Sequence, residues 1–414
     1  MSDFKDFVDK FTDPKKSAVL AVVALVADSE GNEFLNVTSG RTSLDTNANP
    51  VSRTSIFRQA STTKLITALA ALKLVQSGLL ALDDPHLIKS RLPELYDLDV
   101  LVSPPASVGG VGDEWVYEKR ERDITLRMLL THSSGVGYDM FDPRLIAWRE
   151  SRGEQPKSLF GPVEEAFGCP LLFQPGEGWI YGGSLDWVGL LIKRVTGMGL
   201  GEVYRREVFD PVGCDQGIYF PVIRGEEGEK REGGGEADVE VVMTVVRKGE
   251  TLEEHEVFLP TDELGGGGLY ASSENYLKIL ADLIAPEPKL LNKEMMDVLF
   301  SPQFAEGSMP LKGLRDGAPI FASMTGALTG SMDTSNINHS LGGLLITGDE
   351  ESVGMTAGTI TWGGAFGTLW FVNREKGVAG YYATSVFPPG DVKSVELTGK
   401  FVKEVWRRVG QSKK

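Results

Sequence analysis

The sequence predicts an α/β fold in which one antiparallel sheet is built from both ends of the chain, is flanked by helices and is interrupted by a mainly helical insertion. Two observations support this prediction: β-like apolar runs gather near both ends, and the middle alternates short helical patterns with Pro and Gly breaks. The length of 414 residues exceeds that of an ordinary single domain. We therefore assign residues 1–82 and 255–414 to a sheet domain and residues 83–254 to the insertion.

The composition is that of an acidic globular protein. Hydrophobic residues make up 41% and charged residues 24% of the chain, which argues against a disordered or membrane-embedded class. Asp and Glu number 58 against 42 Lys and Arg, and the net charge of -16 disfavours nucleic acid as a partner. Cys169 and Cys214 are too few for a disulfide framework and lie in no zinc-binding pattern, so we expect reduced, buried thiols.

The N-terminal segment is expected to form a helix over residues 1–12, followed by a pair of strands. The apolar run at 17–27 has a length that a signal peptide would also show. It follows sixteen mostly polar residues, and a turn at 28–32 leads from it into a second β-like run at 33–40. We therefore interpret the run as a strand. It is too short to span a bilayer, and with no visible secretion signal we expect a cytoplasmic protein.

Helical spacing of Leu and Ala predicts a helix over residues 62–78, with Ser61 at its start and Gly78 as a stop signal. The insertion is expected to contain further helices at 126–130, 144–149, 163–167 and 184–196. Residues 224–236 are charged and Gly-rich, which is the composition of a mobile loop.

The C-terminal part alternates apolar runs with turns. We expect a helix over residues 275–284 and a final helix over residues 392–409. Between them, β-type patterns predict four strands at residues 339–347, 358–362, 368–373 and 377–384. Together with the N-terminal pair, these strands would make up the single sheet.

The strongest local signal for chemistry is the motif Ser61-Thr-Thr-Lys64. Residues three apart share one face of a helix, so the Lys64 amine would lie beside the Ser61 hydroxyl. A lysine held near an apolar wall can lose its proton and activate such a serine, and the positive end of the helix favours the anion that forms on attack. Taken alone, the motif is weak, because Ser is a common helix N-cap and Lys a common exposed helix residue.

Two further segments gain meaning beside this motif. Tyr181 follows a Gly-bounded turn just before the predicted helix 184–196, and a tyrosine near a lysine can relay a proton. By itself, Tyr181 is equally well explained as a core aromatic residue. The apolar strand around Trp362-Gly-Gly364 carries a Gly pair at which a ligand or a backbone must approach closely, although a simple β-bulge would also explain it.

Taken together, four motifs resemble those of one known family. In order and approximate spacing they match the class C β-lactamase-like serine hydrolases, which have the penicillin-binding-protein fold: Ser61-Thr-Thr-Lys64, Leu129-Leu-Thr-His-Ser-Ser-Gly135, Pro175-Gly-Glu-Gly-Trp-Ile-Tyr181 and Trp362-Gly-Gly364. The resemblance covers most of the chain. More narrowly, the chain looks like the esterase branch of this family and like the fungal polyketide acyltransferases.

The resemblance implies a β-lactamase/transpeptidase-like fold and an acyl-enzyme mechanism. Ser61 would attack the acyl carbonyl, while Lys64 and Tyr181 would share the general-base and general-acid work. The backbone N–H groups of Ser61 and Ala365 would form the oxyanion hole. Contacts with the substrate are expected from Trp362, Gly363, Gly364 and Trp179.

The expected partners are small molecules of secondary metabolism. The acyl donor would be a thioester or an ester, with carrier-protein and coenzyme A thioesters among the candidates, and the acceptor would be an alcohol or an amine. We expect no cofactor, no metal and no membrane partner. His132 lies in a motif that recurs in the family as a structural turn, so no catalytic role is assigned to it.

The chain departs from the β-lactamase pattern at two places. Where β-lactamases and penicillin-binding proteins have Tyr-x-Asn, it has Tyr181-Gly-Gly183; where they have Lys-Thr-Gly, it has Trp362-Gly-Gly364. A β-lactam would therefore lack the cation that binds its carboxylate, and we do not expect antibiotic hydrolysis. The esterase branch shows the same Trp-Gly-Gly replacement.

Other classes of protein fit the sequence less well. A Ser-His-Asp α/β-hydrolase would need a Gly-x-Ser-x-Gly elbow, which is absent. The four histidines are scattered and no His-Glu-x-x-His occurs, so a metallohydrolase would lack ligands. The run Gly265–Gly268 lacks the Lys-Ser/Thr of a phosphate loop and is better explained as a close-packed turn. Three interpretations stay open: an acyltransferase, a carboxylesterase with the same acyl-enzyme, and an inactive binding protein of the same fold.

Overall fold

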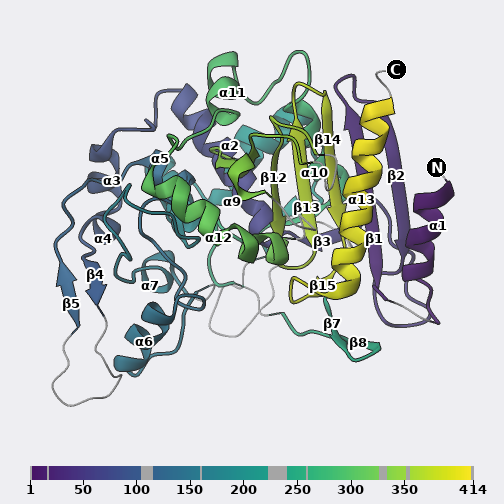
Figure 1. Ribbon diagram of the computed structural model, residues 1–414, viewed down its shortest axis with the longest axis horizontal. Coiled ribbons are helices and arrows are strands. Elements are labelled where there is room, and N and C mark those ends of the chain that lie inside the picture. The colour runs from purple at the N-terminus through teal and green to yellow at the C-terminus, as the bar shows by residue number, and fades with distance from the viewer. Residues whose placement is uncertain are drawn as a thin grey trace.

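The computed structural model describes residues 2–15, 18–103, 115–158, 161–221, 240–257, 260–325, 333–350 and 355–411 (Figure 1). The mobile loop expected at 224–236 lies outside these ranges. Within them, one antiparallel sheet of seven strands has the order β10-β11-β12-β13-β14-β1-β2. Helices cover both of its faces, and further helices lie beyond β12 on the side away from β14 (Figure 1).

Both ends of the chain contribute to this sheet, as the sequence predicts. The N-terminal part supplies β1 (Ala21–Asp28) and β2 (Glu33–Gly40). The C-terminal part supplies β10 (Ile337–His339), β11 (Leu344–Ile346), β12 (Ile360–Gly364), β13 (Thr368–Asn373) and β14 (Val378–Ala383). The two groups join where β1 pairs with β14, with Val23 opposite Ala383. The expected α/β fold class is confirmed.

The single strand expected over residues 339–347 is wrong, because this segment is divided between β10 and β11. A tight turn separates them, and the Ser340 hydroxyl accepts the N–H groups of Gly342 and Gly343 at 3.0 Å each. A Cβ on Gly343 would lie only 2.9 Å from the carbonyl oxygen of Thr361, so this position accepts nothing larger than glycine without a shift. Several helices were not predicted. Among them are α11 (Lys293–Leu299) and α12 (Met309–Thr325) in the C-terminal part, and α3 (Pro85–Arg91), α4 (Pro93–Tyr96) and α9 (Leu200–Tyr204) in the insertion.

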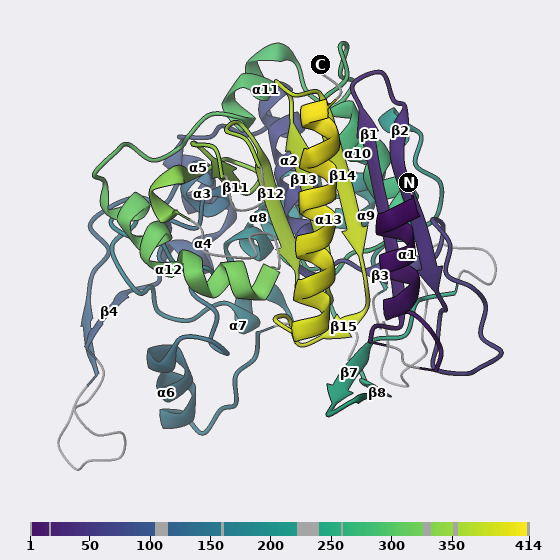
Figure 2. The same cartoon turned by 45° about the vertical axis from the view of Figure 1, so that its right-hand side comes forward.

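Two adjacent tyrosines on β14 show how the sheet faces are covered, because neighbouring side chains on a strand point to opposite faces. The Tyr381 ring stacks on Tyr276 of helix α10 (Ser273–Asp282), with ring centroids 4.7 Å apart. The Tyr382 ring packs against Phe401 of helix α13 (Val392–Gln411) at 5.2 Å. Figure 2 shows α13 in front of the sheet with the N-terminal helix α1 (Ser2–Phe11) beside it.

The segment assigned to the insertion contains helices and also short strands. Its helices are α3 (Pro85–Arg91), α4 (Pro93–Tyr96), α5 (Leu126–Leu130), α6 (Pro143–Ser151), α7 (Val163–Ala166), α8 (Ser184–Thr196) and α9 (Leu200–Tyr204). Its strands are β4 (Val100–Ser103), β5 (Val116–Glu118), β6 (Ile218–Tyr219), β7 (Val245–Lys248) and β8 (Thr251–Glu254). The division into a sheet domain and an insertion stays a prediction.

Both cysteines are buried free thiols, in agreement with the sequence analysis. Burial raises the pKa of Cys169 and of Cys214 to about 12, which keeps both protonated and unreactive at neutral pH. None of the helices in the described ranges has the length and apolar character needed to cross a bilayer.

Candidate active site

The turn that presents Ser61 links strand β3 (Ile56–Arg58) to helix α2 (Thr63–Gln76). Ala60 adopts a left-handed backbone conformation with φ of 45°, which costs a non-glycine residue about 1–2 kcal/mol. Residues Ala60–Thr62 then form one 3-10 turn before the helix begins. Strain of this kind persists only where surrounding contacts impose it.

The buried side chain of Gln59 supplies those contacts. Its Nε2 donates to the carbonyl oxygens of Phe57 at 3.0 Å and Ala271 at 3.2 Å. Its Oε1 accepts from the hydroxyls of Thr62 at 2.9 Å and Tyr381 at 2.8 Å. Because Tyr381 belongs to β14, the central sheet anchors the turn that carries Ser61.

Ser61, Lys64 and Tyr181 meet at one point, as expected from the motifs. The Lys64 amine donates to Ser61 Oγ at 3.3 Å, and the Tyr181 hydroxyl donates to the same oxygen at 2.6 Å. Lys64 is buried, and its Nζ lies 4.8 Å from the centre of the Tyr181 ring. A proton that leaves Ser61 therefore has two neighbouring groups that can take it.

Two groups that the sequence analysis did not single out hold Lys64 in place. The amine donates to the Gly266 carbonyl oxygen at 2.6 Å and to the Tyr138 hydroxyl at 3.2 Å. The next turn of α2 is held in the same way, because the Thr67 hydroxyl donates to the Gly265 carbonyl oxygen at 2.5 Å. The glycine run at 265–268 thus packs directly against the start of α2.

A buried carboxyl group, that of Asp186, lies behind this arrangement. It belongs to the first turn of α8 and accepts the Gly266 N–H at 2.8 Å. Burial raises the pKa of Asp186 to about 6, against the opposing effect of the Lys64 charge. Burial together with the Asp186 charge raises the pKa of Tyr138 well above its usual value, so Tyr138 stays a neutral hydroxyl. The sequence signal for this group is an acidic residue inside the apolar run Leu185-Asp-Trp-Val-Gly-Leu-Leu191.

A buried histidine, His132, packs against Tyr181, and a second buried histidine, His339, packs against His132. The His132 ring lies 4.9 Å from the Tyr181 ring and 5.9 Å from the His339 ring, centroid to centroid. Burial lowers the pKa of His132 well below 6.5 and that of His339 to about 4, so both rings are neutral at pH 7. His132 sits in a tight turn with φ of 58°, in keeping with the structural role expected for its motif.

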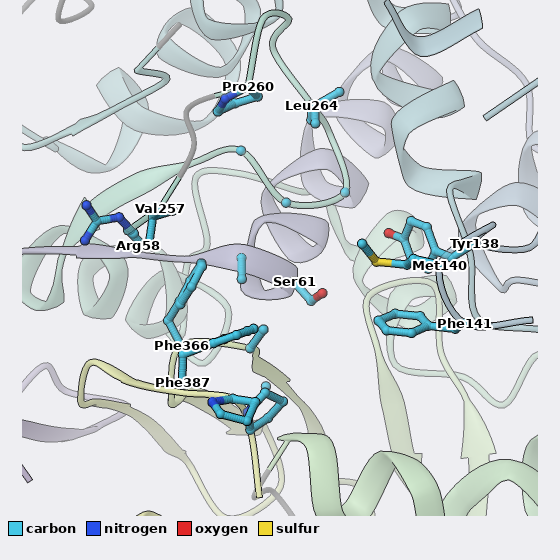
Figure 3. Close-up of a pocket in the computed structure, with 18 of the residues that line it drawn as sticks. Arg58, Ser61, Tyr138, Met140, Phe141, Val257, Pro260, Leu264, Phe366 and Phe387 are labelled. Carbon is cyan, nitrogen blue, oxygen red and sulfur yellow. The ribbon is translucent and has the colours of Figure 1, made fainter. Parts of the chain in front are cut away.

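Ser61 opens into a cavity of about 540 Å³ with mostly apolar walls (Figure 3). Met140 and Phe141 lie on one side of Ser61, and Phe366 and Phe387 lie on another. Arg58 also lines the cavity; its guanidinium group donates to the Tyr270 hydroxyl, the Val242 carbonyl and the Thr244 hydroxyl. The cavity therefore offers an organic substrate an apolar surface around the serine.

The predicted substrate-binding residues fall into two groups. Trp362 and Gly363 line the cavity, whereas Trp179 and Gly364 are not among its lining residues. Trp179 is buried, and its ring packs near those of His132 and His339, with centroids 6.1 Å and 6.3 Å away. The expected substrate contacts of Trp179 and Gly364 stay predictions.

Gly364 has a different role, as a close-packing site. A Cβ on Gly364 would lie 2.3 Å from the carbonyl oxygen of Gln59, so β12 can end against the Ser61 turn only because this residue is glycine. Next to it, Ala365 lies in the turn between β12 and β13 and lines the same cavity as Ser61. The two residues proposed for the oxyanion hole therefore line one cavity.

The described residues include no group of three or more His, Cys, Asp or Glu side chains arranged to hold a metal ion.

The family model described as Beta-lactamase matches residues 8–399 of the chain. The chain belongs to the β-lactamase family.

Curated relatives of this β-lactamase-family enzyme carry two kinds of name. "Acyltransferase calJ" of Penicillium decumbens is 31% identical over 98% of this chain and 98% of its own length. "Lovastatin esterase" of Penicillium rubens is 32% identical over 93% of this chain and 94% of its own length. "Monacolin J acid methylbutanoyltransferase" of Aspergillus terreus is 25% identical over 86% and 82% of the two chains.

Solved structures agree on the fold. A mutant of simvastatin synthase from Aspergillus terreus superposes with a TM-score of 0.82 at 24% identity, covering 99% of this chain and 95% of that chain. EstCE1, described as a hydrolase with promiscuous acyltransferase activity, superposes with a TM-score of 0.72 at 18% identity, covering 97% and 98%. The expected β-lactamase/transpeptidase-like fold is confirmed.

Proposed function

We propose that this enzyme is a serine acyltransferase that moves an acyl group from a thioester or ester donor to a small-molecule alcohol or amine. The observation that carries the proposal is the position of Ser61 Oγ, which lies within 3.3 Å of Lys64 Nζ and 2.6 Å of the Tyr181 hydroxyl at a largely apolar cavity. Nucleophile and proton acceptors within this distance are what acyl-enzyme chemistry requires.

In the first half-reaction, Ser61 Oγ forms a bond with the acyl carbonyl carbon and gives its proton to the Lys64 and Tyr181 pair. The carbonyl oxygen becomes an oxyanion, for which the N–H groups of Ser61 and Ala365 are the proposed donors. When the tetrahedral intermediate collapses, the bond to the leaving thiol or alcohol breaks and that group takes up the proton. Ser61 is then an ester.

In the second half-reaction, an acceptor hydroxyl or amine loses its proton to the same pair and attacks the Ser61 ester. The acyl group moves to the acceptor, and the proton returns to Ser61. An acceptor held in attack geometry competes with water through proximity, which is worth up to about 7–11 kcal/mol. The apolar walls around Met140, Phe141 and Phe366 favour an organic acceptor over water at this step.

The names of relatives extend the proposal to a pathway type. Acyltransferases and a methylbutanoyltransferase align along most of the chain, which supports a role in fungal-type polyketide or other secondary metabolism. We include carrier-protein and coenzyme A thioesters among the donors. We also keep the cytoplasmic location that the sequence favours, which imaging of a tagged protein would test.

A carboxylesterase is the second candidate, because a lovastatin esterase is 32% identical to this chain. Transfer and hydrolysis share one acyl-enzyme and differ only in which nucleophile resolves it. The test is to load Ser61 with 2-methylbutanoyl-N-acetylcysteamine and then to add a panel of alcohols and amines that includes monacolin J acid. Transfer predicts that at least one saturating acceptor outcompetes water for the acyl group. If hydrolysis dominates with every acceptor, the esterase interpretation replaces the transferase.

The third interpretation, an inactive binding protein of this fold, makes a distinct prediction. A serine-directed phosphonate would leave such a protein unlabelled, whereas the proposed enzyme becomes labelled at Ser61. Labelling of the wild-type protein and of the Ser61→Ala variant is therefore measured side by side.

A further inference from the structure

Asp186 is a charged residue in a place where charge is costly. It lies in the first turn of α8 and is fully buried. Burying an ionised carboxylate is expensive unless another charge or hydrogen bonds compensate for it. One compensating contact is the N–H of Gly266, which donates to Asp186 Oδ1 at 2.8 Å.

The local backbone is shaped to bring this carboxylate close. A Cβ on Gly266 would lie 2.3 Å from Asp186 Oδ2, so only glycine allows the approach without a shift. The carbonyl group of the same Gly266 accepts a hydrogen bond from Lys64 Nζ at 2.6 Å. A single residue thus connects the Asp186 carboxylate to the Lys64 amine, and the amine connects to Ser61 Oγ.

We propose that Asp186 is a positioning residue whose negative charge acts on Lys64 through space and through the hydrogen bonds of Gly266. This charge stabilises the protonated form of the Lys64 amine while Ser61 loses its proton during acylation. This inference rests on the proposed function, because it requires Lys64 to take part in proton transfer from Ser61. Asp186 itself does not touch the substrate cavity.

The charges around Asp186 favour this assignment. Lys64 of α2 is the cation whose charge acts on the carboxyl group. The other titratable neighbours are the hydroxyls of Tyr138 and Tyr204, whose pKa values burial and the Asp186 charge both raise, and the carboxylate of Asp262 in the loop before the glycine run. Asp262 forms an ion pair of its own with Lys193, with an N–O distance of 2.7 Å. Lys64 is therefore the partner that balances the buried Asp186 charge.

The consequence concerns the step in which Ser61 loses its proton. A nearby carboxylate stabilises the protonated amine and makes the neutral amine a stronger base. Removing the charge but keeping the hydrogen-bond acceptor should therefore shift the pH dependence of acylation, and not only its rate. A residue with a merely structural role would lower the rate without moving the pH profile.

The experiment uses Asp186→Asn, which keeps an oxygen for the Gly266 N–H but removes the charge. The rate of Ser61 labelling by a fluorophosphonate is measured from pH 5 to pH 10 in the full-length protein, together with its melting temperature. Asp262→Asn is the matched control, since it removes a neighbouring carboxylate that pairs with Lys193. We expect the rising limb of the Asp186→Asn profile to move to lower pH by about 1 unit or more, with a lower plateau, and the control profile to stay in place.

A folded Asp186→Asn variant whose rising limb coincides with that of the wild type would overturn the inference. If the variant does not fold, the labelling profile of the wild type alone decides. The charge of Asp186 should disappear below about pH 6, following its raised pKa, and its loss makes Lys64 easier to deprotonate, so labelling should fall less steeply than about tenfold per pH unit across the range in which Asp186 titrates. A profile that keeps the slope of a single titration through this range would contradict the inference.

Failure of the proposed function would look different. In that case the wild-type protein would not be labelled at Ser61 at all, or the Ser61→Ala variant would be labelled equally. Normal labelling of the wild type with an unchanged Asp186→Asn profile would remove only the role of Asp186.

Discussion

The Tyr181 hydroxyl lies 2.6 Å from Ser61 Oγ although 120 positions separate the two residues in the chain. Ser61 is placed by a strained turn that Gln59 fastens to the central sheet, and Tyr181 is placed by the segment that leads into α8. Lys64 reaches the same oxygen from one helical turn away at 3.3 Å. Ser61 Oγ thus accepts hydrogen bonds from groups in two separate parts of the fold.

Replacing Tyr181 by Phe should lower kcat for acyl transfer by about 10²–10⁴-fold, because it removes the hydroxyl that bonds to the nucleophile. Tyr138→Phe is the matched control, since Tyr138 bonds to Lys64 at 3.2 Å and not to Ser61. Steady-state kinetics on a simple ester should show a much smaller loss for the control. Equal losses in both variants would contradict a special role for Tyr181.

Gly364→Ala should damage activity without touching the proton-transfer groups. Its Cβ would meet the Gln59 carbonyl oxygen at 2.3 Å and the Thr368 hydroxyl at 2.2 Å, so the turn that carries Ser61 must shift. We expect a loss of about 1–3 kcal/mol in the free energy of unfolding and a lower kcat. The control is Gly410→Ala, whose Cβ would meet nothing within 4 Å. Wild-type activity and stability in Gly364→Ala would show that the close packing does not matter.

Stability should fall in acid because His339 is buried in its neutral form, with its pKa lowered to about 4. Between that pH and about 6.5 the unfolded chain binds more protons than the native one, so the free energy of unfolding rises with pH. One such group contributes at most about 1.4 kcal/mol per pH unit. The lowered pKa of His132 also makes the free energy of unfolding rise with pH. The raised pKa of Asp186 has the opposite effect, because the native state then binds more protons than the unfolded chain.

Urea unfolding at a series of pH values between 4 and 7 measures this dependence. The His339→Phe variant should lose less stability on acidification than the wild type does. An identical pH dependence in the two proteins would show that His339 does not cause the effect.

Turnover of β-lactams should be weak or absent. By the motif resemblance, Trp362 takes the place of the family's carboxylate-binding lysine. Its ring packs against Tyr181 with centroids 5.4 Å apart. A β-lactam carboxylate would face an indole at this position instead of a cation. Cephalosporin hydrolysis as efficient as that of simple esters would contradict this prediction.

The sequence predicted the sheet well where strands are buried on both faces, because their long apolar runs are hard to mistake. It failed where the pattern is short or broken by glycine and proline. The turn at Ser340–Gly343 is hidden inside an apolar run. Helix α12 was not predicted because its sequence contains Gly313, Gly317 and Pro319. Glycine and proline have low intrinsic helix propensity.

The candidate site likewise contains residues that the sequence predicted and residues that it did not. The pair Ser61 and Lys64 is local in sequence, yet the pattern alone is not decisive. Ser2 and Lys5 have the same spacing, and Lys5 forms an exposed ion pair with Asp9. The family resemblance supported the motif at Ser61 and added Tyr181.

Tyr138, Gly266 and Asp186 could not be predicted as members of the site. Tertiary packing brings them to Lys64 from the segment after α5, the glycine run and α8, and no spacing in the sequence links these segments. An acidic residue in an apolar helix was the available signal, since burial of such a group requires a compensating partner.

The central claim is that Ser61 carries the acyl group, and intact-protein mass spectrometry tests it most directly. The wild-type protein and Ser61→Ala are incubated with an acyl thioester, and the adduct is located by peptide mapping. We predict one acyl mass on the wild type, on the peptide that contains Ser61, and none on a Ser61→Ala variant that melts at the wild-type temperature. An adduct of equal yield on Ser61→Ala, or on a different residue of the wild type, would contradict the account.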